Sequence, residues 1–143
     1  MTYKSFINTI ITIISGTTLS GINYLDNITF CLESEIGIDK TTVINQCTCY
    51  ITPIPITFND TGIMRFACKV YFISSLTDKD TTKRIQVYDN LISFISNFLY
   101  KLINNTNIHE TYPIEITTGV NTDFDADGIY FTLTTTDTYD CNV

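Results

Sequence analysis

The chain has 143 residues, of which 44% are hydrophobic and only 16% are charged. A chain of this size buries about two-thirds of its surface, which supports one core without disulfide or metal cross-links. The composition excludes intrinsic disorder, and we predict a single domain over residues 1–143. The net charge of −7 argues against a protein that grips phosphate backbones.

The first predicted element is a short apolar helix over residues 2–15. Threonine and isoleucine are abundant in the chain, and such β-branched residues favour strands, so we expect a sheet to dominate the fold. In this segment, however, the apolar side chains recur three and four positions apart, and Gly16 stands where a helix would stop. The period of two that marks a strand is missing.

Three strands are predicted next, over residues 27–33, 46–58 and 63–74, with a loop over residues 34–45. Pro53 and Pro55 lack amide donors, so their stretch must lie at a sheet edge or leave the sheet. The third strand alternates most clearly, and we expect one face to be core and the other to be solvated. The expected core face holds Met64, Phe66, Cys68, Val70 and Phe72, and the expected solvated face holds Arg65, Ala67, Lys69 and Tyr71.

Residues 80–104 carry the strongest helix pattern, which Asp80, Thr81 or Thr82 can cap. Two closing strands, over residues 112–118 and 128–139, are expected to form a hairpin with Phe131 and Leu133 inward. The predicted fold class is therefore α+β, an antiparallel-rich sheet packed by two helices in the order α-β-β-β-α-β-β. The apolar stripe expected to cover the sheet from the long helix comprises Ile85, Tyr88, Leu91, Ile92, Ile95, Phe98, Leu99 and Leu102.

The sharpest local motif is the acidic turn Asp123-Phe-Asp125-Ala-Asp127-Gly128. Three alternate carboxylates followed by glycine resemble the opening of an EF-hand calcium loop. The twelfth position should be a bidentate glutamate but is Thr134, and strands rather than helices flank the turn. Two interpretations stay open: a calcium loop of another type, held by Asp123, Asp125 and Asp127, or a solvated hairpin turn.

Five cysteines form an odd set in a domain that supports its own core. Cys47 and Cys49 share a strand face, and with Cys31 and Cys68 they offer four thiolates for zinc, although the spacing is not that of a structural zinc knuckle. We favour reduced, buried thiols that act as small apolar residues, from which we expect an intracellular location, at least during synthesis. The fifth cysteine is Cys141.

Catalysis has little support in the sequence. No nucleophile elbow, phosphate-binding loop, dinucleotide-binding glycine pattern or His-x-x-x-His occurs. The one histidine, His109, lies in a predicted loop beside Glu110, and Glu33 and Glu35 lie in a polar segment. We therefore predict a protein that is not an enzyme and needs no cofactor.

The chain ends and the basic residues add little. The N-terminal apolar run lacks a small-residue cleavage site, and no run approaches the ~18 apolar residues of a membrane span. Basic residues cluster only at residues 79–84, where the long helix begins. This cluster is either a solvated first turn or a contact with acidic groups elsewhere, including those of a neighbouring subunit.

The predicted order of elements resembles that of small tailed-bacteriophage proteins that close the tail tube or form the neck. These are tail terminators, tail-completion proteins and head-tail connector or neck ring proteins, including those of crAss-like phages, whose A/T-rich genomes fit the composition. The resemblance covers nearly the whole chain, in organisation rather than in a diagnostic motif. The segments that carry it are Phe6-Ile-Asn-Thr-Ile-Ile, residues 46–58 and 63–74, Tyr88-Asp-Asn-Leu-Ile-Ser-Phe-Ile, and Gly128-Ile-Tyr-Phe-Thr-Leu.

This resemblance implies a structural subunit repeated in a six- or twelve-fold ring around the DNA channel, joined to portal, neck or tail proteins. The expected location is the virion, and the host cytoplasm during assembly. Residues 49–58 would offer a strand edge to a neighbouring subunit, and residues 34–45 and 111–127 would be docking loops. An acidic ring would let genomic DNA pass without binding it. The alternative function is a small binding module, either calcium-dependent through residues 123–128 or a virus-encoded interaction protein.

Overall fold

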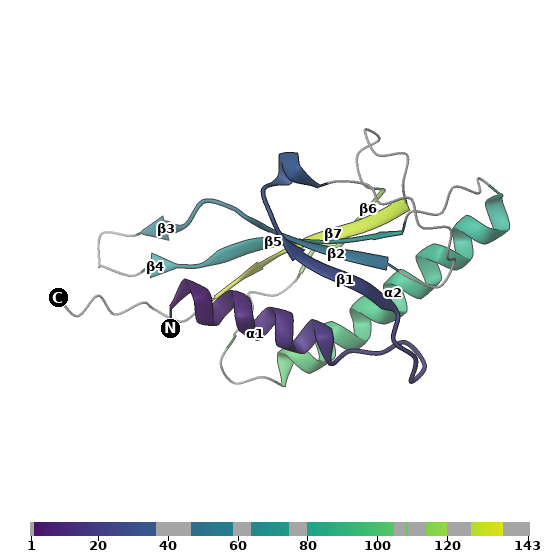
Figure 1. Ribbon diagram of the computed structural model, residues 1–143, viewed down its shortest axis with the longest axis horizontal. Helices are drawn as coiled ribbons and strands as arrows, with labels where there is room; N and C mark the ends of the chain where they lie inside the picture. Colours follow the sequence, from purple (N-terminus) through teal and green to yellow (C-terminus); the bar gives the residue numbers. More distant parts are fainter. Residues whose placement is uncertain are drawn as a thin grey trace.

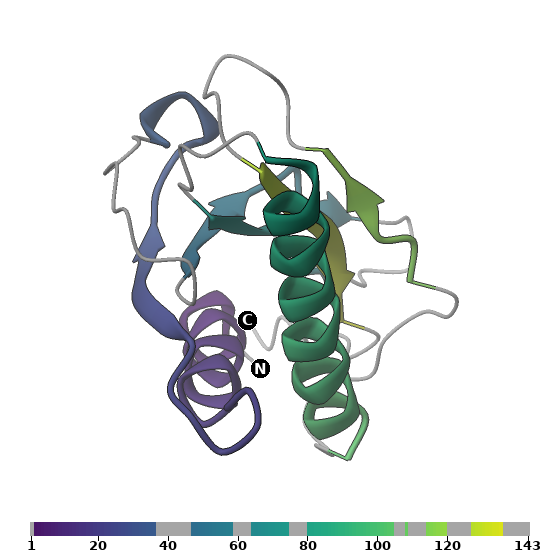
Figure 2. The ribbon, with the colours of Figure 1, turned by 90° about the vertical axis from the view of Figure 1, so that its right-hand side faces the viewer.

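In the computed structural model two helices cover one face of a five-stranded sheet, and a two-stranded ribbon extends beyond it (Figures 1 and 2). The structure describes residues 2–36, 47–58, 64–74, 80–104, 108, 114–119 and 127–135. This arrangement confirms the predicted α+β class. The helices are α1 (Tyr3–Ser15) and α2 (Thr81–Ile103), with a 3-10 turn η1 (Glu33–Glu35), and the strands are β1 (Leu25–Phe30), β2 (Cys47–Pro53), β3 (Thr57–Phe58), β4 (Met64–Arg65), β5 (Ala67–Ser74), β6 (Thr117–Thr118) and β7 (Asp127–Thr134).

The main sheet has the strand order β1-β2-β5-β7-β6. Strands β2, β5, β7 and β6 pair antiparallel, as expected, but β1 pairs parallel to β2. A parallel pair needs a crossover rather than a tight turn, and the chain between Phe30 and Cys47 supplies it. The alternation within a single strand carries no information about this direction.

The strand edge expected at residues 49–58 is wrong for its first part. Strand β2 lies inside the sheet, because β1 pairs with it from Cys47 to Ile51 and β5 pairs with it from Thr48 to Pro53. The second predicted alternative is the correct one: the two prolines end the strand, and the chain leaves the sheet there. The edge strand on this side is β1, where the Asn27 side chain accepts a hydrogen bond from the Ile28 amide.

The main core lies between the sheet and both helices. Phe72 of β5 is fully buried there, with its ring centroid 5.5 Å from that of Phe94 and 6.0 Å from that of Phe131. The predicted core face of this strand is confirmed, since its inner members are buried and Met64 packs against them. The predicted inward positions of Phe131 and Leu133 in β7 are also confirmed.

The opposite face of β5 is not solvated as expected. Ala67 and Tyr71 are buried there, and Ile73 and Tyr50 join Tyr71 in a second, smaller cluster. Ile36, which follows η1, covers this cluster, so the segment after β1 closes a face that the sequence pattern assigns to water. Of the three residues of β5 on this predicted face, only Lys69 is partly exposed.

Helix α2 begins as predicted, because the Asp80 side chain accepts hydrogen bonds from the Thr82 and Lys83 amides. Its predicted core stripe is partly wrong. Ile85 and Ile92 are 60% and 49% exposed. The helix turns instead a face centred on Leu91 and Phe98 toward the sheet, and this face also buries Val87, Phe94, Ile95 and Leu102.

Helix α1 and the closing hairpin follow the sequence closely. Thr2 and Ser5 form a capping box at the start of α1, and the helix ends at Gly16. Strand β7 pairs antiparallel with β6, but β6 is only two residues long, so the strand predicted over residues 112–118 is shorter than expected. Residues 112–113 and 136–139 of the predicted pair lie outside the described residues.

A tight turn over residues 19–22 joins α1 to β1. Leu19 and Ile22 exchange both backbone hydrogen bonds, and Ser20 and Gly21 have φ angles of 51° and 75°. Two central residues with positive φ define a type I′ turn, which favours Asn-Gly. Gly21→Ala should therefore lower the free energy of unfolding by about 1 kcal/mol, and Ser20→Asn should raise it slightly. Thermal unfolding of both variants checks this, and equal effects in the same direction would contradict it.

Candidate functional site

The described polar cluster with the best geometry joins α2 to the start of β7. Arg84 donates two hydrogen bonds to the Asp127 carboxylate, from Nε to Oδ2 at 3.1 Å and from Nη2 to Oδ1 at 2.7 Å. The Tyr88 hydroxyl donates a third, to Oδ1 at 3.2 Å. The Asp127 side chain is 7% exposed and that of Arg84 is 49% exposed. Burial raises the pKa of Tyr88, and the Asp127 carboxylate raises it further, so this hydroxyl stays a donor.

This cluster bears on two predictions from the sequence. Of the three candidate calcium ligands, Asp123 and Asp125 lie outside the described residues, and the carboxylate of Asp127 already accepts bonds from Arg84 and Tyr88. The basic residues at the start of α2 were expected either to be solvated or to contact acidic groups. For Arg84 the acidic group is Asp127 of the same chain. Lys79 lies outside the described residues.

The cysteines do not form a metal centre in the described part of the chain. Cys47, Cys49 and Cys68 are buried on the helix-facing side of the sheet, whereas Cys31 packs in the cluster on the other side. Burial raises the pKa of the Cys47 and Cys49 thiols, so both stay protonated. Among the described residues no group of three or more His, Cys, Asp or Glu side chains could hold a metal ion. Cys141 and His109 lie outside them.

A second polar group lies over the outer sheet face. The Tyr71 hydroxyl donates to Glu33, and the Lys69 ammonium group lies 3.5 Å from the same carboxylate and 4.4 Å from the ring centroid of Tyr130. The hydrogen bond from Tyr71 lowers the pKa of the Glu33 carboxyl group, and the positive charge of Lys69 lowers it further. Because Glu33 is 66% exposed, these contacts hold η1 on the sheet rather than form an enclosed site. Glu35 takes no part in them.

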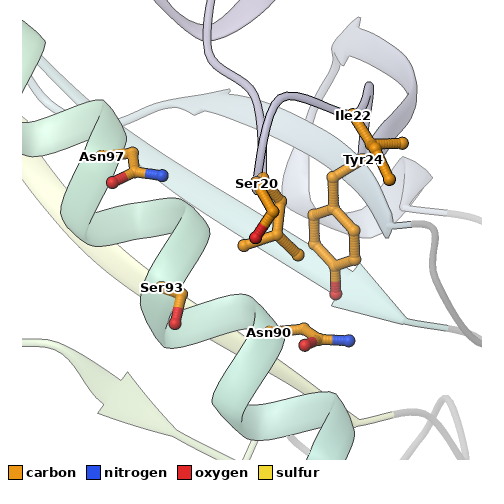
Figure 3. Close-up of a pocket in the computed structure, with 7 residues that line it drawn as sticks. Ser20, Ile22, Tyr24, Asn90, Ser93 and Asn97 are labelled. Atoms are coloured by element: carbon orange, nitrogen blue, oxygen red, sulfur yellow. The ribbon is translucent and has the colours of Figure 1, made fainter.

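An open groove separates the turn at residues 19–22 from α2 (Figure 3). Its volume is about 400 Å³, within the usual range for binding pockets. Leu19 and Ile22 form the apolar side, and the polar side chains Asn90, Ser93 and Asn97, spaced three and four apart on α2, form the other. The groove carries no charged side chain among its lining residues.

Two hydrogen bonds join the chain segment just before this groove to α2. Asn97 Nδ2 donates to the Thr18 carbonyl at 3.0 Å, and the Lys101 ammonium group donates to the Gly16 carbonyl. Tyr24 closes the base, with its ring 5.4 Å from that of Phe94. Its hydroxyl is directed toward α2 and has no hydrogen-bond partner within the described residues (Figure 3). The groove is therefore preformed, and it ends on an unpartnered polar atom.

The ribbon of β3 and β4 forms the other notable surface. It is the continuation of the β2–β5 hairpin past Pro53, and it extends beyond the main sheet at the end where α1 begins (Figure 1). Phe58 is 64% exposed and Ile56 is 44% exposed. A two-stranded ribbon is marginally stable alone in water, and exposed apolar side chains that lie close together are typical of a contact site.

Sequence reasoning missed the groove, and it placed β3 within a longer strand edge expected at residues 49–58. The sequence does show the ribbon's signal, two prolines followed by Ile56 and Phe58 beside a turn, but the pattern does not say whether a partner strand covers it. The groove has no sequence signal, because its walls come from residues 19–24 and 90–97.

No protein-family model matches the chain, and no curated protein matches it. No helix in the described ranges is long and apolar enough to cross a membrane.

Proposed function

We propose that this protein is a structural subunit of a tailed-phage neck or tail ring, which assembles around the DNA channel and joins head or portal to tail. The observation that carries the proposal is the β3–β4 ribbon, which extends from the sheet with Phe58 and Ile56 exposed. An apolar extension of this kind is costly to leave in water, and a neighbouring subunit removes that cost.

The remaining surface supports the same proposal. The described polar clusters serve to hold elements together, with Arg84 and Asp127 tying α2 to β7 and Glu33 tying η1 to β5. A net charge of −7 suits a channel through which DNA slides, since an acidic lining repels phosphate. The subunit is proposed to act without catalysis and without a cofactor.

The experiment is to measure oligomeric state by light scattering coupled to size exclusion and by negative-stain microscopy. The protein is examined alone and after mixing with the portal, neck and tail proteins of the same virion. Closed rings of six or twelve copies, alone or on such a partner, are expected. A strictly monomeric species under every one of these conditions would contradict the proposal.

Metal removal separates the ring from the calcium-binding alternative. Because the Asp127 carboxylate already bonds Arg84 and Tyr88, chelation with EDTA is expected to leave the melting temperature unchanged to within about 1 °C. The variant with both Asp123→Asn and Asp125→Asn serves as the control, and its melting temperature should not respond to calcium either. A marked drop with EDTA that added calcium restores, in the wild type alone, would favour the calcium-dependent binding module instead.

A further inference from the structure

We infer that the β3–β4 ribbon of one copy docks into the groove between residues 19–24 and α2 of the next copy. This inference rests on the proposed function, because it names the contact by which the ring closes. The occupant of the groove is a second copy of this chain, and Phe58 is the inserted side chain.

The two surfaces match in polarity. Phe58 and Ile56 of the ribbon are exposed apolar groups, and Leu19 and Ile22 offer an apolar wall of the groove. A two-stranded ribbon also carries unpaired backbone amides and carbonyls along its outer sides. The row of asparagine and serine side chains on the α2 wall offers donors and acceptors to those groups.

The charges beside the two surfaces are also complementary. Arg65 of β4 is exposed and stands directly opposite Thr57 in the ribbon. Asp26 of β1 is exposed and lies two residues after Tyr24, which lines the groove. A docked ribbon would bring the two opposite charges together at the rim of the contact, where such pairs fix register and speed association.

The placement of the two surfaces explains why the contact would repeat. The ribbon lies at the end of the molecule where α1 begins, and the groove is formed by the chain that follows the end of α1 (Figure 1). Helix α1 has 13 residues and is about 20 Å long, so the two surfaces lie toward opposite ends of it. A contact between two different surfaces of identical subunits is heterologous, and it closes a ring when the rotation between copies permits.

The direct test places the photo-crosslinking residue p-benzoylphenylalanine at position 58 of the full chain. Irradiation is carried out on the protein at high concentration and on the particles assembled with virion partners. Mass spectrometry is expected to find intermolecular cross-links to residues 19–24 or 90–97. Cross-links that map only to other regions, or the absence of any intermolecular cross-link in both samples, would overturn the inference.

Substitutions test the same contact through the assembly constant. Phe58→Asp is expected to weaken assembly at least tenfold, whereas Ile92→Asp, which also places an aspartate at an exposed apolar position, should alter it less than twofold. Arg65→Glu and Asp26→Lys should each weaken assembly, and the double variant should recover most of the loss. Equal effects of the two aspartate substitutions, or no recovery in the charge swap, would contradict the contact. Thermal unfolding of each variant shows that folding is intact.

The outcomes for the contact and for the ring are distinguishable. Closed rings with cross-links elsewhere would retain the proposed function and reject this contact. Cross-links to the groove in open filaments or in dimers, without rings on any partner, would retain the contact and reject the ring.

Discussion

Phe72→Ala is expected to lower the free energy of unfolding by about 3–5 kcal/mol, the largest effect of any single change considered. Phe72 is fully buried in the middle strand of the sheet. Its ring contacts those of Phe94 and Phe98 on α2 and Phe131 on β7, at centroid distances of 5.5, 6.3 and 6.0 Å. Alanine would remove the ring that joins helix and sheet and leave a cavity that these fixed elements cannot fill.

Urea unfolding followed by circular dichroism measures this change. Small domains have a stability of about 5–15 kcal/mol, so the variant should show a much lower unfolding midpoint or be partly unfolded in buffer. Phe72→Leu keeps most of the volume and should lose less than half as much. Ile92→Ala on the exposed side of α2 is the control, with an expected change within about 0.5 kcal/mol. A loss below about 1 kcal/mol for Phe72→Ala would contradict the assignment of this residue to the centre of the core.

Arg84→Ala is expected to lower the free energy of unfolding by about 2–3 kcal/mol. The substitution leaves the Asp127 carboxylate, which is 7% exposed, with the Tyr88 hydroxyl as a hydrogen-bond donor from α2. Removing one member of a buried ion pair costs about 3–5 kcal/mol, and we reduce this value because Arg84 is half exposed and water can reach the gap. The melting temperature should fall by about 6–12 °C.

A double-mutant cycle isolates the pair. Arg84→Met combined with Asp127→Leu replaces both charges with apolar groups and should recover most of the stability lost in either single variant. Arg84→Lys keeps the charge but loses the two-point geometry, so an intermediate loss is expected. Lys4→Ala, at an exposed position on α1, serves as the control. Additive losses in the double variant would show that the two side chains do not act as a pair.

The local pattern of the sequence was enough for each element taken alone. The three-and-four spacing of apolar residues located both helices, Asp80 and Gly16 marked helix ends, and alternation located β5 and its inner face. These signals are local because capping and periodic burial depend on neighbours within about one turn or one strand.

The candidate site was predictable only in part. Asp127 stood out in the acidic turn, but its nearest partner is Arg84, 43 residues away along the chain, so spacing alone suggested a cation instead. Likewise the sequence marks Glu33 only as one of two nearby carboxylates, whereas its contact with Tyr71 spans 38 residues. Neither pairing leaves a pattern in a single sequence, because each depends on which elements the fold places next to one another.

The sequence by itself therefore determined the α+β class, the two helices and the short acidic chain with few basic residues. Only the tertiary structure decided that β1 forms the sheet edge and runs parallel to β2. It also decided that Ile36, just after η1, covers the outer face and that Ile85 and Ile92 stay exposed. The reason is physical: periodicity shows which side chains share a face, but not which other element covers that face. The same rule explains why the groove emerged only once residues 19–24 and 90–97 were placed side by side.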